Sequence, residues 1–213
     1  MTESSRSTIV VHGTPASGHT HRVVNFLGLL ERPYRLSPAA AEVRASAAFR
    51  ALNPLGQIPV IEDGDVVIAD SHAILVYLAR RYAPGTGWLP DEPRAAAEVQ
   101  RWLAIAAGDI RFGLARARAL TLWGGDGSLA EAQALAARIL GFLDGHLRAR
   151  AYLAGDSPTI ADVACYGYVA RAPEGGVALA PYPAVRAWLA RQEAWPRFTP
   201  MVTTPIPATG GAR

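Results

Sequence analysis

The segment 53–79, with the sequence NPLGQIPVIEDGDVVIADSHAILVYLA, constrains the fold of this chain more than any other stretch. Two short apolar runs flank an acidic turn that contains Asp63 and Gly64. An Asp-Gly pair between apolar runs predicts a β-hairpin. Apolar residues at helical spacing begin directly after Asp70 and Ser71, either of which can cap a helix. The segment therefore predicts a hairpin that leads straight into a helix.

The two ends of this hairpin can bind an extended ligand through main-chain groups. Pro59 has no N–H to donate and forces Ile58 out of the helical conformation. The N–H and C=O of Ile58 are then free to pair with an added strand, and the amides at the helix start can hold a carboxylate. If Pro59 is cis, the Ile58 backbone lies in a tight turn close to that helix start. The segment predicts a ligand with an amide in its middle and charges at its ends.

The rest of the chain divides into two parts. Residues 8–52 alternate strand and helix patterns, so the element order through the hairpin helix is β-α-β-α-β-β-α, which is thioredoxin-like. Pro and Gly cluster at 83–87, and helical patterns dominate from Arg94 onward. The predicted fold class is α/β plus all-α, a thioredoxin-like N-terminal domain with a helical-bundle C-terminal domain.

The domain boundaries follow from the same patterns. We predict a first domain over 7–83, a linker over 84–93, a helical domain over 94–200 and a flexible tail over 201–213. Outside the hairpin the predicted elements are strands at 8–12 and 33–36, a helix that includes Val23 to Leu30, and helices at 42–52, 94–118, 128–147, 159–172 and 183–194.

Composition bounds the class of protein. The chain has 213 residues, of which 50% are apolar, enough for two modest cores or one composite core. No apolar run approaches the ~20 residues that span a bilayer, and the polar first eight residues do not form a signal peptide. We therefore expect a cytoplasmic protein with no membrane partner. The single cysteine, Cys165, excludes an internal disulfide and a Cys-x-x-Cys site, and its apolar surroundings predict a buried side chain.

The basic residues are of one kind. All 21 are arginines, which excludes both a Schiff-base lysine and a P-loop lysine. The net charge is only +3, and the arginines alternate with apolar residues along the predicted helices. This pattern favours solvated helix faces over a nucleic-acid surface, so we expect no nucleic-acid partner.

Four motifs in sequence order resemble the cytosolic glutathione transferases. They are N-P-x-G-x-I-P, an acidic residue with a Ser heading S-x-A-I-x-x-Y-L-A, WLPDEP at 88–93, and DSPTIADVACYGYV at 156–169; the similarity continues through YPAVRAWLARQEAWPRF at 182–198. The resemblance covers nearly all of the chain. It implies glutathione as cosubstrate, transfer to a small electrophilic molecule, and a homodimer.

Ser17 is the candidate catalytic residue. Glutathione's thiol has a solution pKa of ~8.5, so lowering it by about two units requires roughly 3 kcal/mol of thiolate stabilisation. A hydroxyl aimed at the sulfur, with a helix N-terminus behind it, supplies this without a charged base. The loop GTPASGHTHRV resembles the S-G-N-C-Y-K-V segment of serine-type bacterial transferases, which places Ser17 on the family's serine. It differs in having His19, Thr20 and His21, and the alternative reading of Ser17 is an ordinary helix cap.

Other hydroxyls and ligand-binding groups follow from the same reasoning. Thr14 and Thr20 are reserve hydroxyl donors, and a tyrosine-type enzyme is disfavoured because His12 and Gly13 end the first strand. The resemblance implies that Asp70 pairs with the γ-glutamyl amine and Ser71 holds the adjacent carboxylate. The predicted glutathione-binding residues are Gln57, Ile58, Pro59, Asp70 and Ser71. Arg44 is a candidate for the glycine carboxylate, an assignment that the sequence leaves open.

The second-substrate pocket is the least constrained part of the site. His19, Trp102, Phe112, Trp123 and Tyr166 are candidates to line it, with core packing as the alternative for each aromatic residue. His12, His19 and His21 do not form a metal site, because residues at i and i+2 do not share a helix face. His72 is expected on a helix surface.

Two further expectations concern architecture. Thr159 and Asp162 fit a capping box, with Asp in place of the usual Glu. A single chain would expose the apolar faces of the helices at 71–81 and 94–122, and a symmetric pair would bury them. Isomerisation, dehalogenation or ether cleavage with glutathione remain open as reactions. A non-catalytic binding or protein-interaction module is the alternative function, because fold alone does not imply activity.

Overall fold

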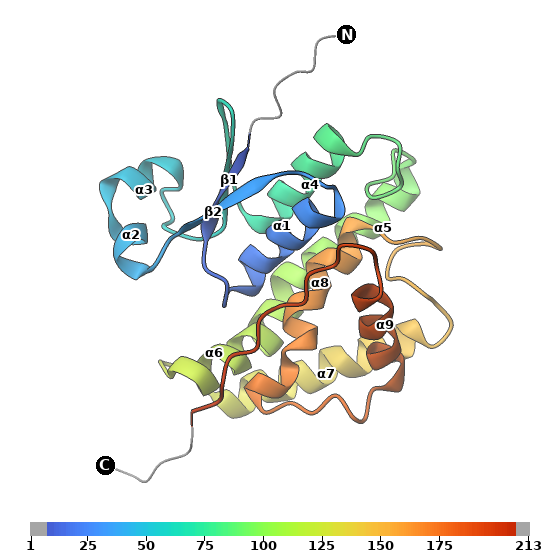
Figure 1. Cartoon of the computed structure of the whole chain (residues 1–213). Helices are drawn as coiled ribbons and strands as arrows, with labels where there is room; N and C mark the ends of the chain where they lie inside the picture. Colours follow the sequence, from blue (N-terminus) through green and yellow to red (C-terminus); the bar gives the residue numbers. More distant parts are fainter. Residues whose placement is uncertain (1–7, 208–213) are drawn as a thin grey trace, which may run out of the picture.

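The N-terminal part of the protein has the predicted thioredoxin-like architecture. A computed structural model describes residues 8–207 (Figure 1). Its sheet has the strand order β2-β1-β3-β4, with β1 parallel to β2 and antiparallel to β3, and β3 antiparallel to β4. The strands are β1 (Ile9–Gly13), β2 (Tyr34–Pro38), β3 (Val60–Asp63) and β4 (Val66–Ala69). The hairpin predicted around Asp63 and Gly64 is thereby confirmed.

Helices cover both faces of this sheet. α1 (Gly18–Leu29) and α4 (Ser71–Tyr82) lie between the sheet and the helical part, whereas α2 (Ala41–Ala45) and α3 (Ala47–Leu52) lie on the other side (Figure 1). The predicted single helix at 42–52 is wrong. Ser46 adopts an extended conformation and its Oγ accepts from the N–H of Phe49 at 3.2 Å, so it ends α2 and caps α3. Phe49 then packs against Ala39 and Val60 in a small separate cluster.

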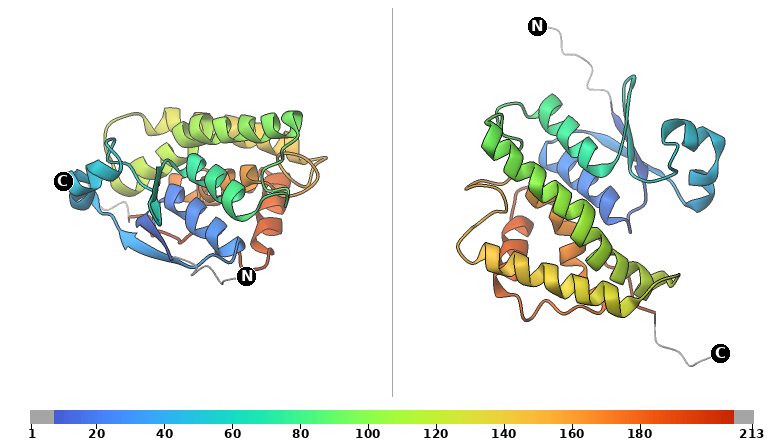
Figure 2. Two further views of the ribbon diagram at one scale, coloured as in Figure 1. Left: turned by 90° about the horizontal axis from the view of Figure 1, so that it is seen from above. Right: turned by 180° about the vertical axis from the view of Figure 1, so that it is seen from behind.

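The C-terminal part is helical, as predicted. Its α-helices are α5 (Pro93–Ile105), α6 (Arg116–Trp123), α7 (Leu129–Leu147), α8 (Ile160–Ala170) and α9 (Pro183–Glu193), with a 3-10 turn, η2 (Ala172–Gly175). The predicted α-helix at 94–118 differs from the structure, because α5 continues into a π-helical segment, η1 (Ala106–Ala115), and then into α6. These three form one long rod when the molecule is viewed from behind (Figure 2). π-Helical turns inside α-helices occur frequently at functional sites.

The capping box at the start of α8 is confirmed. Thr159 Oγ1 accepts from the N–H of Ala161 at 3.2 Å, and Asp162 Oδ2 accepts from the N–H of Thr159 at 3.0 Å. Asp162 Oδ1 also accepts from the N–H of Leu153 at 3.0 Å and from Nε1 of Trp188 at 2.9 Å. The carboxylate is fully buried, so it ties α8 to α9 and to the loop before it as well as capping the helix.

One composite core joins the two parts. Phe26 of α1 and Leu75 of α4 belong to the same buried cluster as Trp102 of α5 and Val163 of α8. Cys165 is buried in this cluster, as predicted. Within residues 8–207, no helix combines the length and apolarity needed to cross a membrane.

The segment after α9 is packed, so the predicted flexible tail is wrong at 201–204. The carbonyl of Thr199 lies 2.6 Å from Nε2 of His21, and Met201 is buried. Oγ1 of Thr204 accepts from Arg118 at 2.9 Å. The segment runs across α8 in Figure 1. Residue 7 of the predicted first domain and residues 208–213 of the predicted tail lie outside the described residues.

Candidate active site

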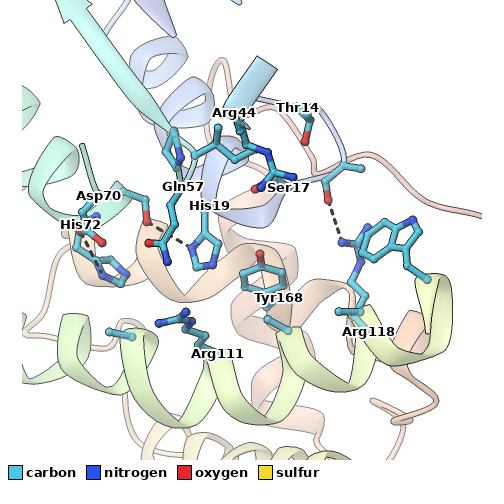
Figure 3. A pocket seen from close by; sticks show the side chains of 18 residues that line it. Thr14, Ser17, His19, Arg44, Gln57, Asp70, His72, Arg111, Arg118 and Tyr168 are labelled. Atoms are coloured by element: carbon cyan, nitrogen blue, oxygen red, sulfur yellow. Dashed lines mark hydrogen bonds and ion pairs between the residues drawn. The ribbon is translucent and has the colours of Figure 1, made fainter. Parts of the chain in front are cut away.

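A cavity of about 400 Å³ lies where the thioredoxin-like part meets the helical rod (Figure 3). Its N-terminal wall is formed by residues from the loops before α1, β3 and α4 and from α2. Its helical wall comes from η1, α6 and α8. The structure brings together at this cavity the predicted residues Thr14, Ser17, His19, Arg44, Gln57, Ile58, Pro59, Asp70 and Ser71.

The turn before β3 presents main-chain groups to the cavity. The peptide bond between Ile58 and Pro59 is cis. Neither the N–H nor the C=O of Ile58 pairs with another main-chain group in residues 8–207. Gln57 is exposed at the cavity edge, and its carbonyl accepts from Nδ2 of Asn53 at 2.8 Å. This turn can therefore bind an extended ligand in the way a sheet edge does.

The start of α4 presents both a carboxylate and a helix N-terminus. Asp70 is the N-cap: its Oδ1 accepts from the N–H of His72 at 2.9 Å and of Ala73 at 3.1 Å. The Asp70 side chain is 68% exposed, so it remains accessible to a cation. Ser71, the first residue of the helix, is buried against the protein and borders the cavity. A ligand end that carries an ammonium and a carboxylate fits this pair of groups.

The start of α1 presents the hydroxyl of Ser17. Ser17 is the N-cap, and its Oγ accepts from the N–H of Thr20 at 3.3 Å. A hydroxyl that accepts here keeps its own proton for a group in the cavity. Thr14 also borders the cavity, but Thr20 does not: it is 1% exposed, and its Oγ1 accepts from the N–H of Thr14 at 3.3 Å. Thr20 therefore lacks the access that a reserve hydroxyl donor needs.

A buried arginine lies behind the N-terminal wall. Nη1 of Arg22 lies 2.9 Å from Nδ1 of His19, 3.0 Å from Oγ of Ser71 and 3.0 Å from Nε2 of His72. Because a guanidinium only donates hydrogen bonds, Nδ1 of His19 and Nε2 of His72 must both be acceptors. Burial, and next the charge of Arg22, lower the pKa of His19 to about 2 and of His72 to about 4. Both histidines are thus neutral at physiological pH, and His72 borders the cavity instead of lying on the outer helix surface.

The cavity is electropositive. Arg44, Arg111 and Arg118 border it, while Asp70 is the only carboxylate among its described lining residues. Arg118 is 2% exposed and pairs with Glu174 at 2.7 Å, which neutralises much of its charge. The arrangement suits a ligand that carries more negative than positive charge.

The helical wall differs from the one expected. Ala107, Arg111, Ala115, Ala119 and Trp123 recur every four residues along the rod and all border the cavity. The lining residues that sequence reasoning missed are Tyr168, Arg111, Arg118, His72, Ala16 and the three alanines of the rod. The regular spacing of four residues could have predicted that residues 107, 111, 115, 119 and 123 lie on one side of the rod, because residues at i and i+4 share a helix face.

Three of the aromatic candidates do not line this cavity. Trp102 is fully buried against Phe142 and His146, and Tyr166 is fully buried with its hydroxyl donating to Glu193 at 2.7 Å. Phe112 is 57% exposed and points elsewhere on the surface of η1. Trp102 and Tyr166 therefore pack in the core, which was the alternative to lining the second-substrate pocket. Tyr168, two residues after Tyr166, borders the cavity instead.

The two remaining histidines have separate partners. Nε2 of His12 lies 2.5 Å from Oε1 of Glu62 on the neighbouring strand. His21 faces away from the cavity toward Thr199 and packs against Tyr166 and Phe198. Burial lowers the pKa of His21 to about 4.

Fold and cavity together define a thioredoxin-like protein whose helical domain completes an electropositive cavity. Comparison with known proteins gives the family. The glutathione S-transferase N-terminal domain model matches residues 11–87, and the C-terminal domain model matches residues 126–191. Glutathione S-transferase 3 of Zea mays is 34% identical over 92% of this chain and 95% of its own length. The Escherichia coli K12 protein GstB is 28% identical over 93% of this chain and 99% of its own.

Solved structures agree. The crystal structure of a glutathione S-transferase from Pseudomonas fluorescens Pf-5 has a TM-score of 0.86 and 32% identity, covering 92% of this chain and 100% of that one. A Drosophila mojavensis homologue, solved with bound glutathione, has a TM-score of 0.78 and 27% identity over 89% of each chain. The chain belongs to the cytosolic glutathione S-transferase family, whose enzymes use glutathione as a cosubstrate.

Proposed function

We propose that this glutathione transferase activates the thiol of glutathione with the hydroxyl of Ser17 and transfers the peptide to a small electrophilic molecule. The observation that carries the proposal is the position of Ser17: it caps α1 at the edge of the cavity that also contains Ile58 and the start of α4. A helix N-terminus and a free hydroxyl proton both favour a thiolate over a thiol.

Glutathione would lie across the N-terminal wall. Its γ-glutamyl ammonium would pair with Asp70, its α-carboxylate with the Ser71 hydroxyl and the first amides of α4, and its cysteinyl amide with the main chain of Ile58. Arg44, half-buried on α2, and Gln57 border the same cavity and are suited to the glycine carboxylate. The bound glutathione in the Drosophila mojavensis homologue supports this choice of ligand.

The second substrate would occupy the helical wall. The alanines at 107, 115 and 119 leave room there, and His19 and Trp123 border the same space. The lining is a mixture of small apolar and cationic groups, which suits a small electrophile. Conjugation, isomerisation, dehalogenation and ether cleavage all begin with the same attacking thiolate, so they share the first step.

The test is a titration of the thiolate. Ultraviolet absorbance of bound glutathione, followed against pH, gives the thiol pKa in the wild type and in Ser17→Ala. We expect the wild-type value to lie below that of free glutathione and the variant to raise it by about one unit or more. Thr20→Val is the matched control, because that hydroxyl is buried away from the cavity. Equal titrations for wild type and Ser17→Ala would remove Ser17 from the reaction.

We further infer a cytoplasmic homodimer, as is typical of the family. The helix α4 has no apolar face left for a partner at Ile74, Leu75 and Leu78, because these residues are fully buried in the chain's own core, contrary to the expectation from sequence. The exposed positions on α5 and η1 are mostly alanines and polar residues, such as Ala97 and Ala104, and Phe112 is the one large apolar side chain exposed there. Sedimentation over a range of concentrations tests the dimer, and a monomer at all concentrations would exclude it.

A further inference from the structure

The ring of Tyr168, on α8, packs directly against the start of α1. Its ring packs so tightly against Gly18 that a Cβ added at residue 18 would lie 2.7 Å from the ring's Cζ. The ring also meets His19 edge to face, with centroids 5.1 Å apart and an interplanar angle of 71°. Only a residue without a side chain at position 18 lets the phenol approach this far. The side chain of Tyr168 extends from α8, packs against α1 and is 8% exposed.

The first turn of α1 lies beside two hydroxyl groups, those of Ser17 and Tyr168. The N–H of Thr20 donates to Oγ of Ser17. The ring of Tyr168 lies against Gly18, and the N–H groups of His19 and Gly18 favour the phenolate form, which acts to lower the pKa of Tyr168. A hydroxyl oxygen that faces donors must aim its own proton elsewhere. No side chain or main-chain carbonyl in residues 8–207 accepts a hydrogen bond from Tyr168, and its hydroxyl points across the cavity toward the side that carries Ser17 (Figure 3).

The phenol stays protonated at neutral pH. Burial raises the pKa of Tyr168, while the cations of Arg22 and Arg118 and the two amides act in the opposite direction. The hydroxyl is therefore a hydrogen-bond donor that these groups polarise, and it does not act as a base. A donor polarised by two amides and two cations forms stronger hydrogen bonds to an anion than an isolated phenol does.

We propose that Tyr168 is a second catalytic residue, whose hydroxyl donates to the glutathione sulfur opposite Ser17. The proposal rests on the proposed function, since it assumes that glutathione reacts as a thiolate in this cavity. On binding, the thiol proton leaves to solvent, and both hydroxyls keep their protons and hydrogen-bond to the sulfur anion. The sulfur then forms a bond to the electrophile, and the electron pair moves onto the electrophile or its leaving group. The positive end of α1 reaches the sulfur through these two hydroxyls, one from each domain.

The test compares Tyr168→Phe with Tyr166→Phe. The first substitution removes the hydroxyl and keeps the ring under Gly18, so we expect the pKa of bound glutathione to rise by about one unit, a tenfold loss of thiolate below that pKa. The value of kcat/KM for a small electrophile should fall about tenfold in the same pH range. Tyr166→Phe removes a neighbouring hydroxyl that faces Glu193, outside the cavity, and should leave the titration unchanged.

Gly18→Ala tests the same contact without altering Tyr168. The added Cβ would displace the ring, and we expect the glutathione pKa to rise as in Tyr168→Phe. An unchanged pKa in Tyr168→Phe, with a raised pKa in Ser17→Ala, would overturn this inference and leave the proposed function standing. Lower turnover at an unchanged pKa would also overturn it, because the hydroxyl would then contact the electrophile. A wild type that does not lower the thiol pKa would overturn both.

Discussion

Two buried arginines flank the cavity, and their surroundings are opposite. Arg118 on α6 is 2% exposed and pairs with the buried Glu174 at 2.7 Å, with further hydrogen bonds to the carbonyl of Ala16 and to Thr204. Arg22 on α1 is 1% exposed, hydrogen-bonds to neutral groups of His19, Ser71 and His72, and has its guanidinium carbon 5.7 Å from the ring centroid of Tyr168. Its Nε and Nη2 have no partner among residues 8–207.

Arg118 therefore holds parts of the fold together, whereas Arg22 supplies a positive electrostatic field beside the cavity. Arg118 joins α6, η2, the loop before α1 and the C-terminal segment, and its charge is compensated inside the protein. Arg22 has no carboxylate in contact with it behind the start of α4, where the proposed γ-glutamyl carboxylate would bind, and Asp70 offsets its charge only from a distance. Burying an unpaired charge is costly, so its retention is explained best by the charge that an anionic ligand brings. The two arginines should therefore respond differently to removal of charge.

The largest expected effect is on the paired arginine. Glu174→Gln leaves Arg118 buried without a counter-charge, and we expect the free energy of unfolding to fall by about 3–5 kcal/mol in urea titrations. The control is Asp109→Asn, which breaks the exposed ion pair with Arg138 at 2.8 Å and should cost less than about 1 kcal/mol. Similar losses in the two variants would mean that Glu174 is no anchor.

The second effect is a loss of stability in acid on the Arg22 side. The folded pKa of His72 is about 4 and that of His19 about 2, both below the unfolded value of 6.5, so the unfolded chain binds more protons. Both contributions are fully present above pH 6.5; that of His72 is lost as the pH falls to about 4, by up to about 3 kcal/mol, and that of His19 continues to fall toward pH 2. Unfolding free energies between pH 7 and 4 measure this. In His72→Gln the decline should be shallower, and an equal slope would contradict the assignment.

The third effect concerns the carboxylate that faces the ligand. Asp70→Asn keeps an oxygen for capping α4 and a side chain that tolerates the φ of 72°, but it removes the charge that would pair with the γ-glutamyl amine. We expect glutathione to bind more weakly by about 1.5–3 kcal/mol in calorimetry, with a nearly unchanged melting temperature. Unchanged affinity would remove Asp70 from the binding site.

The smallest effect is on the unpaired arginine itself. Arg22→Met removes a buried charge that has no carboxylate partner, so stability at pH 7 should change by less than about 1 kcal/mol or increase. Glutathione affinity should nevertheless weaken, by about 1 kcal/mol, because the positive field behind Ser71 is lost. Calorimetry and urea unfolding on the same protein separate the two quantities. A large loss of stability with unchanged affinity would make Arg22 a structural residue like Arg118.

The N-terminal half of the site followed from local sequence. The hairpin at Asp63 and Gly64 and the helix that starts at Ser71 depend on turn and cap chemistry within a few residues, as does the capping box at Thr159 in the helical part. Local rules were also enough to mark Ile58 as a residue with free main-chain groups. The break at Ser46 was missed because a helical pattern of apolar residues does not reveal a single extended residue within it.

The half of the site that the helical part forms could not be predicted from local sequence in the same way. Tyr166 and Tyr168 lie two residues apart on a helix that is buried on nearly every side, so the sequence pattern does not tell which one faces a cavity. Arg111 lies in a π-helical segment that the sequence pattern did not predict, and the pairing of Arg118 with Glu174 joins residues 56 positions apart. Sequence by itself determined the family, the order of the elements and the backbone-made part of the site, because these rest on short-range patterns. Only the tertiary structure decided which hydroxyls, imidazoles and arginines share the cavity, because that depends on how α1 packs against α8 and the rod.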